Sequence, residues 1–199
     1  MLTSDGFFSS YHLCWSRPDA ESLLGDLEAA GVRAHHPVTR RITLLSPGAE
    51  PSGTQSWVTR DQLVLLAGLQ RLDRVDFLLW LDSGAGIPAR IRRGDDGTVG
   101  LRFTLGSLSR ADQEHALRAV REAIGRASLL CVGFVVDREG ASAATDWHGF
   151  IVKGTVYFDC WPDTLAVLPE VAAAQPQLSG VNSFEQSPWV VYGSDVPNR

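Results

Sequence analysis

The chain has 199 residues, of which 44% are apolar and 21% are charged, so it can bury about 70% of its unfolded surface and needs no disulfide or metal to fold. No apolar stretch approaches 18 residues, which excludes a membrane-spanning helix. Residues 1–127 carry 15 basic and 15 acidic side chains, whereas residues 128–199 carry three basic and eight acidic ones. The acidic last third disfavours binding to nucleic acid. It favours binding to a basic partner, or it is simply a solvated acidic surface.

The first quarter of the chain predicts a strand, a helix and two more strands. Residues 7–15 alternate in polarity, as a strand does. Ser16 is a typical helix N-cap, and Gly31 stands where a helix C-terminal cap belongs. Strands are expected at residues 32–36 and 41–45.

A loop is predicted at residues 46–56, which contain two prolines and two glycines. We expect a single domain over 1–199, with this loop as a possible hinge that divides it into 1–56 and 57–199. Thr59 and Gln62 then fit a capping box at the start of a leucine-rich helix.

The next segment predicts three strands and a helix. The strands are expected at residues 75–82, 87–93 and 99–105, with a hairpin turn at Asp95-Asp96-Gly97. Ser109 caps the helix that follows.

The same order appears a second time from residue 129. Strands are expected at 129–136, 150–152 and 155–161, followed by a helix that begins at Pro162 and a last strand at 189–192. The two copies share no residue-level identity, so a true repeat and a coincidence of element order both remain open. The pattern predicts an α+β fold, a mostly antiparallel sheet with helices on one face.

The long polar loop at residues 137–149 is the first candidate site, because binding residues often follow a buried strand. Its carboxylates and aromatic side chains, together with those of the next predicted strand, suggest a partner-binding face. The residues of this predicted face are Asp137, Glu139, Asp146, Trp147, His148, Asp159 and Trp161. An ordinary surface loop with an anchoring tryptophan gives the same pattern.

No catalytic residue is assigned, but an alternative interpretation is an enzyme. His148 would be its acid–base group, and Arg90 or Arg92 would hold an anion by bidentate contacts. Arg93 and Arg102 belong to the same arginine cluster, which is equally typical of a solvated strand face.

The cysteines point to a reducing cytoplasm. Cys14, Cys131 and Cys160 are odd in number and widely spaced, which argues against a disulfide framework or a zinc site. We expect all three to be small buried hydrophobes. Adjacent His35 and His36 would point to opposite faces of a strand, so no metal and no cofactor are predicted.

The order of residues 75–93, the capped helix, residues 129–140 and the following DWHGF resembles small uncharacterised actinobacterial proteins, some of which are regarded as immunity proteins of polymorphic toxin systems. The resemblance covers residues 75–165 and transfers no catalytic residue. It implies a toxin–antitoxin role in which an acidic, aromatic surface blocks a basic toxin domain.

Three hypotheses follow. The first is a non-catalytic cytoplasmic protein-binding module, an immunity protein or inhibitor, with a basic protein partner and with neither nucleic acid nor membrane as partner. The second is a small-molecule enzyme with a pocket near the loop at 137–149. The third is a structural subunit of a larger assembly.

Overall fold

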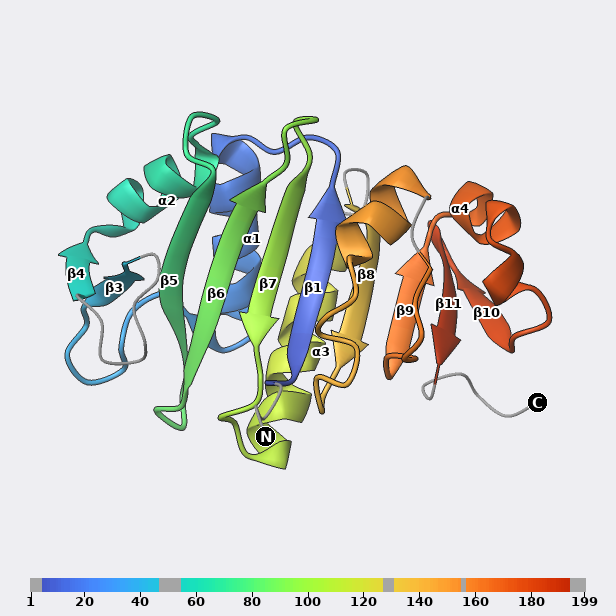
Figure 1. The fold of residues 1–199 in the computed structure, drawn as a ribbon. Helices are drawn as coiled ribbons and strands as arrows, with labels where there is room; N and C mark the ends of the chain where they lie inside the picture. Colours follow the sequence, from blue (N-terminus) through green and yellow to red (C-terminus); the bar gives the residue numbers. More distant parts are fainter. Residues whose placement is uncertain (1–4, 47–54, 127–130, 155–156, 194–199) are drawn as a thin grey trace.

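A computed structural model describes residues 5–46, 55–126, 131–154 and 157–193. These residues form one 11-stranded sheet in which every pairing is antiparallel, together with helices on both of its faces (Figure 1). This confirms the predicted α+β fold class and antiparallel sheet, whereas the helices lie on both faces rather than on the one face predicted. None of the helices in these ranges is both long and apolar enough to cross a membrane.

The spatial order of the strands is β10-β11-β9-β8-β1-β7-β6-β5-β3-β4, and β2 pairs with β5. The strand bounds in chain order are β1 Phe7–His12, β2 Val32–Arg33, β3 Ile42–Leu45, β4 Gln55–Val58, β5 Arg74–Leu81, β6 Gly86–Arg93, β7 Val99–Thr104, β8 Cys131–Asp137, β9 Thr164–Val167, β10 Ser183–Gln186 and β11 Trp189–Gly193. The helices are α1 Arg17–Ala29, α2 Arg60–Gly68, α3 Arg110–Arg126, the π-helix η1 Gly149–Lys153, α4 Pro169–Ala174 and the 3₁₀ turn η2 Pro176–Leu178.

Strand β1 lies in the middle of the sheet and is buried at every position. It pairs with β7 on one side and with β8 on the other, so the first strand joins two segments that follow it by about 90 and 120 residues. Strand β4 spans the predicted boundary at residues 56 and 57 and pairs with β3. Most of the predicted hinge, residues 47–54, lies outside the described residues.

The three long helices α1, α2 and α3 cover one face of the sheet, behind it in Figure 1. Their predicted starts are confirmed. Ser16 and Asp19 form a reciprocal capping box before α1, and Thr59 and Gln62 form another before α2. Gly31 ends α1 with a φ of +86°, a conformation that favours glycine.

The opposite face is covered over only part of its area. The segment at residues 137–154 packs on β8, in front of the sheet in Figure 1, and α4 packs against β11, so that both contribute to a second apolar core. Gly133 in β8 makes this close approach possible, because a Cβ there would lie 2.8 Å from Cγ2 of Ile151 and 2.5 Å from the carbonyl oxygen of Ala166. Among the described residues, no helix covers β7, β6 or β5 on this face (Figure 1).

The second three-strand unit predicted from the sequence is wrong in its elements. Residues 150–152 are π-helical, because the Asp146 side chain accepts a hydrogen bond from Gly149 N at 2.9 Å and starts a helical turn. Residues 155–156 of the next predicted strand lie outside the described residues, and residues 157–161 belong to no strand. A short apolar run fits a strand and a buried helical turn equally well, so its periodicity misled the prediction.

The predicted helix from Pro162 is also wrong at its start. Residues Thr164–Val167 form β9, where Thr, Leu and Val fill a gap between β8 and β11. Pro169 occupies the first turn of α4, where its missing N–H has no consequence. The last predicted strand is confirmed as β11, and β10 lies in a segment for which no strand was predicted.

Candidate functional site

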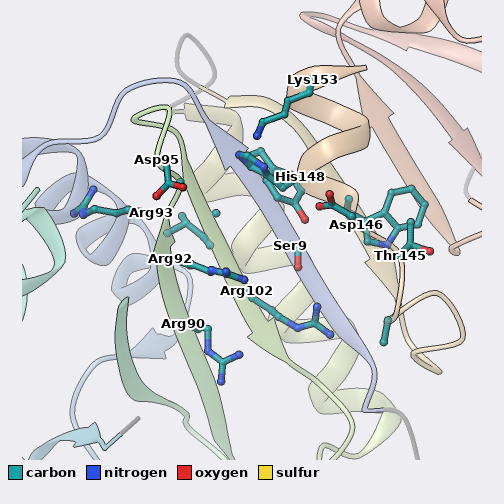
Figure 2. Close-up of a pocket in the computed structure, with 16 residues that line it drawn as sticks. Ser9, Arg90, Arg92, Arg93, Asp95, Arg102, Thr145, Asp146, His148 and Lys153 are labelled. Carbon is teal, nitrogen blue, oxygen red and sulfur yellow. The ribbon is translucent and has the colours of Figure 1, made fainter. Parts of the chain in front are cut away.

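A cleft of about 540 Å³ lies on the face of the sheet that the long helices leave free. Its floor is made by β1, β7 and β6, and its wall by the segment from Ala143 to Lys153. Figure 2 shows arginines rising from the floor while His148, Asp146 and Lys153 come from the wall.

The floor follows from strand alternation. On β6 and β7 the apolar positions face the helices, so Arg90, Arg92 and Arg102 face the cleft. The register places Arg90 opposite Arg102 and Arg92 opposite Gly100, which carries no side chain. Ser9 of β1 lies opposite Arg102 on its other side. Three guanidinium groups therefore share one small area of the sheet.

Arg102 is half-buried and lies flat on the sheet. Its Cζ is 3.9 Å from the centre of the Phe7 ring, a cation–π contact. Within the described ranges its guanidinium makes neither a hydrogen bond nor a salt bridge. Burial lowers the pKa of Arg102 and the charge of Arg90 lowers it further, while Tyr11, Asp137 and Asp5 act in the opposite direction. A desolvated cation beside a second cation is an unfavourable arrangement until an anion joins it.

The other arginines of the cluster differ in what they contact. Arg90 donates from Nε to Asp76 Oδ1 at 2.7 Å, and Arg74 also pairs with this buried carboxylate. Arg92 is exposed, and no ion pair of its side chain occurs among the described residues. Arg93 points away from the cleft in Figure 2 and donates to the carbonyl oxygens of Ala67 at 2.7 Å and Leu69 at 2.9 Å. Arg93 therefore supports the end of α2.

Asp137 holds the start of the wall segment in place through hydrogen bonds. Its carboxylate accepts hydrogen bonds from the backbone N–H groups of Glu139, Gly140 and Ser142 at 3.2, 2.6 and 2.6 Å, and from the Ser142 hydroxyl at 2.6 Å. Trp147 donates from Nε1 to the Ser142 carbonyl at 3.1 Å and packs on aromatic rings of the second core. These contacts fix the path of the loop over β8.

A hydrogen-bonded chain joins wall and floor at one end of the cleft. The Thr98 hydroxyl donates to Asp96 Oδ1 at 2.5 Å and lies 2.6 Å from His148 Nε2. Because a hydroxyl carries one proton, His148 Nε2 must itself donate to Thr98, which leaves Nδ1 as the only possible base on the neutral ring. The Thr98 hydroxyl lowers the pKa of Asp96, and Lys153 Nζ lies 3.8 Å from the same carboxylate.

The structure separates the predicted partner-binding residues into two groups. Glu139, Asp146, Asp159 and Trp161 are exposed, and His148 is half-buried at the cleft. Asp137 and Trp147 are only 3% and 2% exposed, so they cannot contact a partner in this conformation and instead hold the loop. The prediction that both lie on the binding face is corrected on this point, because polar loop composition does not distinguish an internal acceptor from a surface one.

The residues predicted for the alternative interpretation, an enzyme, lie close together in the structure. His148, Arg90 and Arg92 all line the one cleft, as an enzyme of the expected kind would require. No cysteine is among the described residues that line it, and the serine on its floor, Ser9, is 3% exposed. The arrangement offers cations and hydrogen-bond donors without an activated nucleophile.

The cysteine predictions hold for one residue of three. Cys131 is buried, and burial raises the pKa of its thiol to about 12. Cys14 and Cys160 are exposed, which corrects the expectation that they are core residues. Cys14 follows the end of β1, and Cys160 lies in a segment without the predicted strand. No group of three or more potential metal ligands is present in the described part of the chain.

Sequence reasoning missed several residues of the cleft. Tyr11 lies beneath it, and burial raises the pKa of its phenol. Thr98 and Lys153 complete its closed end. Ser9 is a polar residue on the same strand face as Phe7 and Tyr11, but nothing in the sequence showed that β1 lies beside β7. Lys153 directly follows the strand predicted at residues 150–152, and no feature of the sequence indicates that it approaches Asp96.

No family model, curated protein or solved structure matches this chain.

Proposed function

We propose that this chain is a non-catalytic binding protein that holds an acidic group of its ligand in the arginine-lined cleft. The observation that carries the proposal is Arg102, a half-buried guanidinium beside Arg90 that lacks an ion-pair partner within the described residues. Arg92 adds an exposed cation two residues along the same face as Arg90. A carboxylate or phosphate that accepts bidentate hydrogen bonds would complete this site.

The absence of an activated nucleophile along the described lining favours binding over catalysis. His148 Nε2 is engaged by Thr98, so the ring is held as a part of the cleft wall. We also propose that the protein is cytoplasmic, because free cysteines are typical of a reducing compartment. The free cysteines are Cys14, Cys131 and Cys160.

The test is calorimetric titration of the protein with citrate and with inorganic pyrophosphate, at low and at high salt. Each hydrogen-bonded charge contact contributes about 1.5–3 kcal/mol, so Arg92→Gln or Arg102→Met should weaken binding roughly tenfold or more. Arg102→Met keeps the packing on Phe7 while it removes the charge. Arg110→Gln is the matched control, since the Arg110 side chain is 92% exposed on α3, outside the cleft.

If the protein binds neither anion, or if the Arg110 variant loses as much affinity as the cleft variants, the cleft is not an anion site. Arg102→Met also has a second expected effect. Without ligand it should melt no lower than the parent protein, because it removes an unpaired, desolvated charge.

A second candidate function is the inhibitor or immunity protein of a toxin system, which binds a basic toxin domain through its acidic face. The exposure of Glu139, Asp146, Asp159 and Trp161 favours it, since exposed carboxylates around an aromatic side chain suit a basic partner. Charge reversal at Glu139, Asp146 and Asp159 should then abolish capture of a basic partner. If the charge-reversed protein still captures the partner, this acidic face is not the binding surface.

A further inference from the structure

We propose that the ligand of the cleft is an extended, acidic segment of polypeptide whose carboxylates stand on alternate residues. This inference rests on the proposed function and specifies what the arginines hold. It follows from the spacing of the arginines, from the shape of the floor and from the charges and rings around the cleft.

The spacing of the cations matches an extended chain. Arg90 and Arg92 lie two residues apart on one face of β6, which separates their Cα atoms by about 6.7 Å at the usual strand rise. An extended peptide repeats its side chains on one face at the same interval. Carboxylates at positions i and i+2 of such a peptide therefore face the Arg90–Arg102 pair and Arg92 in turn.

The floor allows a backbone to approach. Gly100, opposite Arg92, puts no side chain of its own on the sheet surface, and the Tyr11 ring lies beside it, 3.6 Å from where a Cβ would stand. The wall of the cleft carries the small side chains of Ala143 and Thr145 beside Asp146 and His148. A segment laid between them would contact the floor along its length and reach the arginines with its acidic side chains.

Charge and ring burial favour a polypeptide over a nucleic acid. A nucleic acid carries a charge at every phosphate, so the net charge of −5 and the carboxylates of Asp95 and Asp146 at the cleft repel it more than a short peptide with carboxylates on alternate residues. The aromatic rings along the cleft, Tyr11 and Trp147, are 9% and 2% exposed and offer no surface on which bases could stack.

The lining also differs from that of an ordinary small-molecule pocket. Such pockets are mostly apolar with a few polar groups, whereas this one is lined mainly by charged and hydrogen-bonding side chains. A ligand that contacts it through many polar groups and its own backbone suits this lining.

The experiment is fluorescence anisotropy with two labelled octapeptides of identical composition, one alternating Glu and Ser and the other with four Glu followed by four Ser. Unlabelled citrate, pyrophosphate and a single-stranded DNA oligonucleotide serve as competitors. We expect the alternating peptide to bind at least tenfold more tightly. Arg92→Gln should remove most of that preference, and Gly100→Val should weaken the alternating peptide while Arg110→Gln changes nothing.

The outcomes separate this inference from the proposed function. The inference is overturned if the two peptides bind with equal affinity. It is also overturned if citrate, pyrophosphate or DNA binds more tightly than the alternating peptide. If the binding of these anions still depends on Arg92 and Arg102, the anion site itself stands. If no anion or peptide binds in a way that depends on these arginines, both the inference and the proposed function are overturned. Melting curves of each variant identify any that fails to fold.

Discussion

Asp137 should stabilise the protein more than any surface carboxylate, because its four hydrogen bonds hold the wall of the cleft. Asp137→Ala removes the carboxylate that accepts hydrogen bonds from the backbone N–H groups of the buried residues Gly140 and Ser142. An unsatisfied buried donor costs about 1–3 kcal/mol, so we expect a loss of about 2–6 kcal/mol in the free energy of unfolding. At about 2–4 °C per kcal/mol for a chain of this size, the melting temperature should fall by roughly 4–24 °C.

A graded series of variants tests the origin of this loss. Ser142→Ala removes only the hydroxyl contact and should cost about 1 kcal/mol, while Asp137→Asn keeps one acceptor oxygen and should fall between the two. Urea unfolding measures all three, and hydrogen exchange at the amides of Gly140 and Ser142 reports the loop itself. If Asp137→Ala is as stable as Ser142→Ala, and both amides stay protected, the carboxylate does not organise the wall and this reasoning is refuted.

Three further predictions concern the sheet and the rim of the cleft. Burial lowers the pKa of His12 to about 4, below its unfolded value. The free energy of unfolding should therefore be highest above pH 6.5 and fall by about 3 kcal/mol as the pH drops toward 4, and His12→Phe should show a flatter dependence on pH in urea unfolding. Gly133→Ala should lower the melting temperature by several degrees, because its Cβ meets Ile151, while Gly125→Ala, with open space around it, should not. Thr98→Val should shift the imidazole NMR signals of His148 and leave those of His115 unchanged.

The floor of the cleft could be predicted from the sequence, whereas the wall could not. Alternation in residues 87–93 and 99–105 placed Arg90, Arg92 and Arg102 on one face, and strands with a two-residue period keep that property in any sheet. Arg93 was grouped with them by sequence proximity, although its odd position sends it to the helix side.

The wall depends on pairings between distant parts of the chain. Trp147 and Asp137 became internal because β8 pairs with β1 and the following loop folds back over β8. Glycine at position 133 leaves the space for that loop, and a lone glycine in an apolar strand does not reveal which segment will occupy it. Capping signals, by contrast, act within four residues, and Ser16 and Thr59 were identified correctly for that reason.

The acidic net charge and the basic cleft act together under the proposed function. Screening limits the field of exposed charges to about 8 Å at physiological salt, so a large polyanion meets the acidic surface before it can reach the arginines. Arg102 is half-buried and screened less, which makes its attraction strong but short in range. A short acidic segment that enters the cleft gains this attraction and touches little else of the surface. The distribution of charge, rather than its sum, would then decide which anions this protein binds.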